Sequence, residues 1–416
     1  MPERQGSNGV FYGWFVVGAC FLLALTLGET FWSFGVFFKP LENEFGWSRT
    51  IISSGYSAFL VGYAVSSVVS GGLVDRMSPR PIVLFSAIVA GLGIALCSQI
   101  ESVAQLRLFL FIAGVGSGPT WTVASSTVMR WFYGHKRSGL ALGTTTTGVG
   151  FGAILFAPLI NFFILDYGWR NAFLYVGIIF IVLLSLAALV IRPSPAIVEE
   201  PTEGYQGNRK ASSLWRVLFS PAFVGVTLLV CAAIMAFQAL SVHLAPHAID
   251  QGMSATSAAV ALAVIGGFSI PGRILSGTVS STLGWTRTLA TALFGMSLSL
   301  VWLFHLNATW MLYAFALCYG LFHGVRIPAQ LGIVTEFFGM SRLGQLIGIT
   351  TAIGQVAGAA APSLAGFAYD RTGSYSIVFL VMIAVLAGTA LMALFMSPKP
   401  REPRAPTSYG NATPLH

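Results

Sequence analysis

The chain has 416 residues, of which 55% are hydrophobic and only 9% are charged, and its mean hydropathy is +0.78. Soluble domains carry about 25% charged residues, so this composition excludes a soluble globular protein. A formal net charge of +8 could suit a nucleic-acid partner, but the basic residues are distributed as in a membrane protein, and no nucleic acid is expected.

Apolar stretches separated by short polar connections predict an all-α membrane protein, because about 20 apolar residues in a helix cross a bilayer. The first stretch is too long for a cleaved signal peptide and leads directly into further spans. We predict twelve spans, over residues 12–38, 51–73, 81–99, 105–129, 138–162, 170–192, 219–243, 255–279, 286–305, 309–333, 343–367 and 375–396.

The basic residues predict the orientation of these spans. If both termini lie on one side, that side collects fifteen Lys and Arg residues, against five on the other (Lys39, Arg49, Arg107, Arg170 and Arg371). Cytoplasmic loops carry such an excess, so both termini are expected in the cytoplasm, with the protein in the cell (inner) membrane.

A polar segment divides the spans into two sets of six. We therefore predict an N-terminal six-helix bundle over 1–192, a cytoplasmic linker over 193–218, a C-terminal bundle over 219–397 and a disordered tail over 398–416. A monomer is expected.

The two sets of spans repeat each other. A shift of 206 residues places Pro40, Gly114 and Gly118 on prolines and glycines of the second half, namely Pro246, Gly320 and Gly324. A duplicated six-span unit is the architecture of transporters in which two bundles tilt about a site near the midplane.

The connection after the second span supports this interpretation. It runs from Gly71-Gly72 to Asp75-Arg76 and on to Arg80, and it resembles the signature loop of the major facilitator superfamily. Asp75 near a helix end could pair with Arg76 or Arg80, so these three residues are predicted to form a conformational latch. The equivalent loop of the second half lacks the Asp-Arg pair.

Three stretches narrow the resemblance to one branch of that superfamily. Residues 13–17 (GWFVV), 32–41 (WSFGVFFKPL) and 131–143 (WFYGHKRSGLALG) are similar to the monocarboxylate transporter family and its bacterial relatives, including oxalate–formate antiporters. The resemblance implies that Arg273, in a Pro-Gly-Arg context, holds the substrate carboxylate. A guanidinium suits this role because it binds a carboxylate through two parallel hydrogen bonds.

The chain departs from these families at other positions. It has Trp32 where the monocarboxylate transporters carry a lysine, Ser269 where they carry an acid, and Ile353 where the oxalate antiporters carry a lysine. Neither family's coupling mechanism can therefore be transferred whole.

Two further charged residues lie inside spans, where charge is costly and usually functional. Arg326 shares a helical stripe with Tyr319, His323 and Gln330, and Glu29 precedes Trp32 by one turn. Glu29 is either a structural counter-ion for one arginine or the proton carrier, and His323 is a rival proton site.

The remaining lining is predicted by residue type. Thr120, Gln238 and Gln355, together with Trp32, are candidate substrate contacts. Hydrogen bonding between packed helices explains such residues equally well. His243 and His247, near the outer end of the seventh span, are expected at the surface or in a gate and not on a metal.

These features predict a secondary transporter of small monocarboxylates such as lactate or pyruvate, coupled to protons by alternating access. The alternatives are an anion exchanger of the oxalate–formate type and, in a different class, a transport-inactive membrane sensor. The sequence has no nucleotide-binding loop, catalytic triad or metal-ligand spacing, so neither an enzyme nor a cofactor is expected.

Overall fold

A computed structural model describes residues 11–74, 76–132, 137–194, 214–338 and 343–396. Their fold is all-α, as predicted, and eleven of the described helices are long and apolar enough to cross a membrane. The longest, α6 (Ser138–Val190), contains two predicted spans, which part at Gly168, where φ is +80°. Division there gives the twelve predicted crossings.

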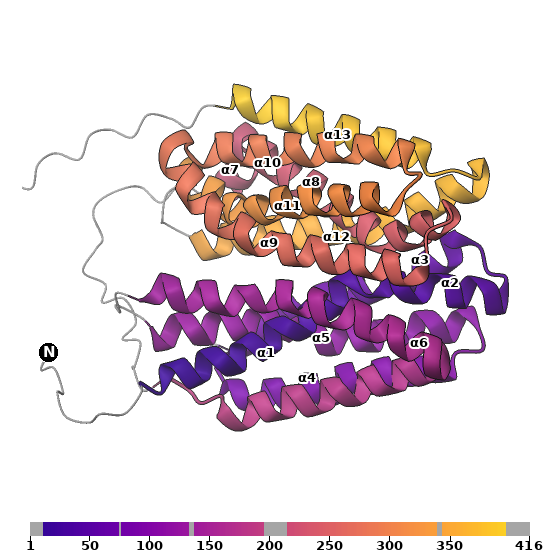
Figure 1. The fold of residues 1–416 in the computed structure, drawn as a ribbon. Helices are drawn as coiled ribbons and strands as arrows, with labels where there is room; N and C mark the ends of the chain where they lie inside the picture. Colours follow the sequence, from indigo (N-terminus) through magenta and orange to yellow (C-terminus); the bar gives the residue numbers. More distant parts are fainter. Residues whose placement is uncertain (1–10, 75, 133–136, 195–213, 339–342, 397–416) are drawn as a thin grey trace, which may run out of the picture.

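The N-terminal half consists of α1 (Gly13–Trp32), α2 (Phe34–Phe45), α3 (Arg49–Val74), α4 (Pro79–Leu96), α5 (Val103–Trp131) and α6, with a short 3₁₀ turn, η1 (Cys97–Gln99), after α4. The C-terminal half consists of α8 (Pro221–Asp250), α9 (Ala255–Leu283), α10 (Trp285–Leu300), η3 (Val301–His305), α11 (Thr309–Phe338), α12 (Leu343–Thr372) and α13 (Ser376–Phe395). Figure 1 shows the halves as two layers of helices lying side by side.

The helix boundaries differ from the prediction in three places. The first span continues beyond residue 38 into α2, with a break at Ser33, and the seventh continues to Asp250 instead of ending at 243. Leu214–Leu218 forms a short helix, α7, inside the predicted linker. The extended ends of α2 and α8 carry charged side chains, Lys39 and Asp250, that pair with each other. This pairing explains why both helices continue beyond the end of their apolar stretches.

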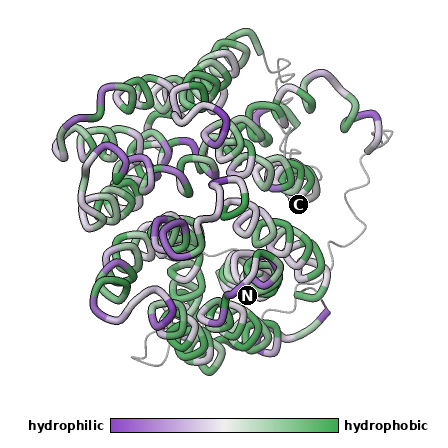
Figure 2. Tube along the Cα trace, turned by 90° about the vertical axis from the view of Figure 1, so that its right-hand side faces the viewer, coloured by the Kyte–Doolittle hydropathy of each residue, from purple (hydrophilic) through white to green (hydrophobic). Residues whose placement is uncertain are grey.

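The hydropathy of the helices fits a lipid environment. Figure 2, which views the molecule from the end where α2 lies, shows apolar segments around the outside of both halves. Large exposed side chains such as Leu165, Leu298 and Phe395 belong to these helices. Such surfaces are stable in hydrocarbon and not in water.

The predicted repeat is visible in the packing. In the first half, Gly114 and Gly118 of α5 lie against the backbone carbonyls of Phe59 and Tyr63 of α3. In the second half, the glycines 206 residues later, Gly320 and Gly324 of α11, lie against the carbonyls of Ile265 and Ser269 of α9. The same two close approaches, at the same spacing, therefore hold both α3–α5 and α9–α11 together.

Candidate functional site

Arg326, which is buried, and Arg273, which is partly buried, come together because α9 and α11 touch backbone to backbone. Gly272 of α9 has no room for a side chain, since a Cβ there would meet the carbonyl of Leu321 and the Cα of Gly324. This contact places Arg273, the next residue, and Arg326 close enough for their charges to repel each other. We call Arg273, Arg326, His323 and Tyr319 the arginine site.

Each arginine is held by one nitrogen of its guanidinium. Nη1 of Arg326 donates to Oε1 of Gln330 at 2.9 Å, one turn along α11. Nη1 of Arg273 donates to the backbone carbonyl of Thr146, which belongs to α6 of the other half. In both residues Nε is buried and has no hydrogen-bond partner among the described residues. The Nε–Nη2 edge of each guanidinium is the edge that matches a carboxylate.

Polar groups beside the arginines also lack partners. The hydroxyl of Tyr319 and Nδ1 of His323 are buried without a hydrogen bond to any described residue. Both residues lie within electrostatic range of Arg326, and His323 also lies within range of Arg273. Unsatisfied buried polar groups cost about 1–3 kcal/mol each, and more when charged. Four such groups therefore lie together in the arginine site.

Trp32 closes over this site from the N-terminal half. Its ring lies 5.4 Å from that of His323 and 4.8 Å from that of Phe237, between centroids. Trp32 is 2% exposed and Arg326 is 5% exposed. The arginine site is therefore covered by aromatic rings where the two halves meet.

The two predicted glutamines form a second polar contact near the same interface. Nε2 of Gln238 in α8 donates to Oε1 of Gln355 in α12 at 3.4 Å. The hydroxyl of Tyr56, from α3, donates to Oε1 of Gln238, also at 3.4 Å. Gln238 thus joins the halves beside Trp32, its counterpart in the repeat.

Two predicted residues form no described hydrogen bond or ion pair with the arginines. Thr120 is buried and its hydroxyl donates to the carbonyl of Ser117 in its own helix, at 2.6 Å. Glu29 is 7% exposed, and its carboxylate accepts a hydrogen bond from the Thr30 hydroxyl at 3.3 Å. Among the described ion pairs, none joins Glu29 to Arg273 or Arg326, so this conformation shows no counter-ion contact.

The predicted latch consists of Asp75, Arg76 and Arg80, at the connection between α3 and α4. Asp75 falls outside the described residues, while Arg76 and Arg80 are exposed where α3 ends and α4 begins. The latch stays a prediction.

A cluster of charges that was not predicted from the sequence lies where α2, α3, α8, α12 and α13 meet. This is the end of the helices away from the start of α1 and the end of α13. Nζ of Lys39 lies 2.6 Å from carboxylate oxygens of both Glu42 and Asp250. Arg49 is 2% exposed, and its Nε and Nη2 pair with Glu42 at 3.0 Å and with Asp250 at 2.6 Å. Its Nη1 donates to the hydroxyl of Tyr375 at 2.7 Å.

The same end contains a helix cap that one half supplies to the other. Oδ1 and Oδ2 of Asp370, in α12, accept the backbone N–H groups of Arg49 and Thr50 at 2.9 Å each. These are the first amides of α3, which have no partner within their helix. We call Lys39, Glu42, Arg49, Asp250, Asp370 and Tyr375 the ion-pair cluster. It joins the two halves far from the ends at which α1 begins and α13 ends (Figure 1).

One signal for this cluster is visible in the sequence: acidic and basic residues lie at the very ends of long apolar helices, with almost no loop to solvate them. Glu42, Arg49, Asp250 and Asp370 all occupy such positions.

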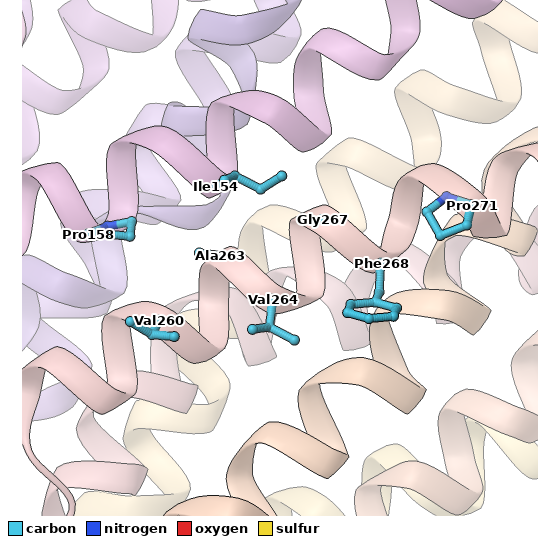
Figure 3. A pocket seen from close by; sticks show the side chains of 8 residues that line it. All are labelled: Ile154, Pro158, Val260, Ala263, Val264, Gly267, Phe268 and Pro271. Carbon is cyan, nitrogen blue, oxygen red and sulfur yellow. The ribbon is translucent and has the colours of Figure 1, made fainter.

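An apolar groove between α6 and α9 is a different feature. Figure 3 shows it lined by side chains from both helices, including Ile154, Pro158, Phe268 and Pro271. Its eight lining residues carry no charge or hydrogen-bonding side chain, and Phe268 is exposed at the outer surface of α9. The groove therefore suits hydrocarbon and does not suit an anion.

Comparison with known proteins agrees with the fold. The family model described as Major Facilitator Superfamily matches residues 20–309 and 286–414. Monocarboxylate transporter 13 of Rattus norvegicus is 30% identical over 398 residues, covering 94% of this chain and 91% of its own. The oxalate:formate antiporter of Oxalobacter formigenes is 27% identical over 314 residues, covering 73% and 72%.

Among solved structures, a D-xylose-proton symporter has a TM-score of 0.77 at 14% identity, with 93% of this chain and 98% of that chain covered. A bacterial homolog of the human lysosomal transporter Spinster, inward-facing and unoccupied, has a TM-score of 0.70 at 17% identity, with 94% of both chains covered. The chain therefore belongs to the Major Facilitator Superfamily, on the branch that includes the monocarboxylate transporters.

Proposed function

We propose that this protein carries a small monocarboxylate of the lactate or pyruvate kind across the cell membrane, together with a proton, by alternating access. The observation that carries the proposal is the arginine site. Two guanidinium groups lie near each other, each with a buried and unpartnered Nε, and no described carboxylate forms an ion pair with either. Buried charge is stable only when it is paired, so an anionic substrate would complete this site.

The proposed binding mode follows from the free edges. A carboxylate would accept two parallel hydrogen bonds from the Nε–Nη2 edge of one arginine and a further bond from the Tyr319 hydroxyl. The rings of Trp32 and Phe237 would cover the short carbon chain of the substrate. The substrate passes through without chemical conversion, so the protein acts as a carrier and not as an enzyme.

Alternating access is supported by the position of the contacts between the halves. The ion-pair cluster joins the halves at the end away from the termini, where it would act as a gate. With both termini in the cytoplasm, this gate would lie on the outer side, and the present conformation would load or release substrate on the inner side.

The proton would bind separately from the anion. Glu29 is buried and has no cation partner among the described ion pairs, so its ionised form would be costly here. We propose that it holds a proton in this conformation, which favours the carrier role over the counter-ion role.

Transport assays in proteoliposomes test this function. Labelled lactate should accumulate against its gradient when the loading side is made acidic, and an uncoupler should abolish accumulation. Two free guanidinium edges also favour a second candidate, exchange of a dicarboxylate for a monocarboxylate. In that case a counter-anion inside the vesicles would drive uptake and a pH gradient would not.

A further inference from the structure

We propose that His243 is a proton-operated switch of the ion-pair cluster: its neutral ring helps to hold the two halves together, and its protonation releases them. This inference deepens the proposed function, because it names the group through which a proton would control loading at the gate. His243 lies in α8, seven residues before Asp250.

The ring of His243 bridges the halves. Its Nε2 lies 2.8 Å from the carbonyl oxygen of Pro362 in α12 and 3.1 Å from the hydroxyl oxygen of Ser53 in α3. Its Nδ1 lies 2.7 Å from the hydroxyl oxygen of Tyr375, the residue before α13 begins. Since Ser53 belongs to the N-terminal half, the ring is bonded to both halves at once, and it is only 2% exposed.

The partners fix which nitrogen carries the hydrogen. The carbonyl of Pro362 can only accept, so Nε2 must be the N–H that donates to it. In the neutral ring Nδ1 is then an acceptor, and it takes the hydrogen of the Tyr375 hydroxyl. The oxygen of Tyr375 in turn accepts from Nη1 of Arg49 at 2.7 Å. A directed chain therefore runs from Arg49 through Tyr375 and His243 to Pro362.

Protonation would break this chain at its centre. Both ring nitrogens of a positive histidine are donors, so Nδ1–H would point at an oxygen that already accepts from Arg49. The hydroxyl hydrogen of Tyr375 would lose its acceptor, and two cations would flank one oxygen. Movement of Arg49, which belongs to the other half, away from Tyr375 would remove this repulsion between the two cations.

The charges around the ring come from every element packed against it. From α3, Arg49 repels a positive ring, and from α12, Asp370 attracts one. From α2, the ring of Phe38 packs against the His243 ring, with 5.4 Å between centroids. Tyr375, just before α13, contributes its hydroxyl, and His247 lies one turn further along α8. Glu42 and Asp250 bind Arg49 in the same cluster, and Lys39 binds these two carboxylates, so movement of Arg49 would disturb all three residues.

The experiment measures the opening of this end without substrate, so it is independent of whether the cargo is a carboxylate. Spin labels go on cysteines placed at Ser102 of the N-terminal half and Thr309 of the C-terminal half, both exposed, after the four native cysteines are replaced by alanine. In the parent protein, acidic buffer should shift the distance distribution towards longer distances, compared with alkaline buffer.

His243→Gln is the main variant, because glutamine can donate to Pro362 and accept from Tyr375 but cannot take up a proton. Its distances should stay short in both buffers. His247→Gln is the matched control: that histidine is buried in the same helix, but among the described residues the hydrogen-bond partner of its Nε2 is the Leu303 carbonyl of its own half, at 3.3 Å. It should respond to acid as the parent does.

A second variant keeps the proposal testable if His243→Gln does not fold. Tyr375→Phe removes the hydroxyl that links Arg49 to His243, so its distances should be long even in alkaline buffer. The proposal is overturned if His243→Gln responds to acid like the parent protein, if His247→Gln loses the response to the same extent, or if Tyr375→Phe behaves like the parent in both buffers.

Discussion

Replacing Arg273 by lysine tests the proposed carboxylate contact most sharply. Lysine keeps the positive charge but loses the planar edge that offers two parallel N–H groups. The Thr146 carbonyl already takes Nη1 of Arg273, so a lysine ammonium would have to serve both that carbonyl and the substrate with one atom. The variant should therefore keep its fold and bind the anion through a single contact.

The expected loss follows from the bond that disappears. A hydrogen bond to a charged group contributes about 1.5–3 kcal/mol. At about 1.4 kcal/mol per factor of ten, the half-saturation concentration for lactate should rise about ten- to a hundredfold. The maximal rate should fall less, because the charge that neutralises the anion remains.

The assay is the initial rate of labelled lactate counterflow in proteoliposomes, measured across substrate concentration. Arg287→Lys is the matched control, since Arg287 is an exposed arginine at the start of α10 and should tolerate the same change. An unchanged half-saturation concentration in Arg273→Lys would refute the two-point contact. An equal loss in both variants would point to general damage.

Three further changes test other parts of the site. Glu29→Gln removes the proposed proton carrier but leaves its size, so it should abolish accumulation driven by a pH gradient and spare counterflow; acid-driven accumulation at the parental level would contradict the role. Arg49→Gln removes the buried cation of the ion-pair cluster, and breaking such a pair costs about 3–5 kcal/mol. The distance between labels at Ser102 and Thr309 should therefore lengthen in every buffer. An unchanged distance would show that the cluster does not hold the gate closed. Gly28→Ala places a Cβ against the Val149 carbonyl of α6 and should lower stability by about 1–3 kcal/mol, seen as a lower melting temperature in detergent. Gly18→Ala, on the same helix with open space at its Cβ, should change the melting temperature little, and equal effects would refute the packing argument.

The fold was predictable because membrane insertion leaves its mark on local sequence. Long apolar runs and the spacing of basic residues act within a single span, so they identify helices without knowledge of their partners. The division of α6 at Gly168 also has a local cause: one glycine with a positive φ turns the chain between the fifth and sixth predicted spans. The ends of α2 and α8 were placed too early because their charged residues are neutralised by each other and not by water.

The candidate site was predictable only in part. Arg273 and Arg326 were identifiable because a charge inside an apolar run is conspicuous. Their unpartnered edges were not, since they depend on the contact between α9 and α11 that Gly272 permits. Glu29 shows the opposite outcome: helical spacing placed it one turn from Trp32, but its carboxylate accepts from the Thr30 hydroxyl and forms no described ion pair with either arginine.

The repeat also indicates how the arginine site would move. A shift of 206 residues relates Arg326 to Thr120 and Arg273 to Ser67, and in the N-terminal half both hydroxyls donate to carbonyls of α5, those of Ser117 and Gly118. The two halves therefore share a backbone plan, but only the C-terminal half carries the cations. An anion bound to them would travel with that half while the N-terminal half supplies the covering ring of Trp32. The Nη1 contact of Arg273 with Thr146 is the exception, because it crosses to α6 and would have to break if the halves tilt as proposed. A carboxylate on the Nε–Nη2 edge of Arg273 leaves Nη1 free to keep that contact, so the contact would break in the tilting step and not in the binding step.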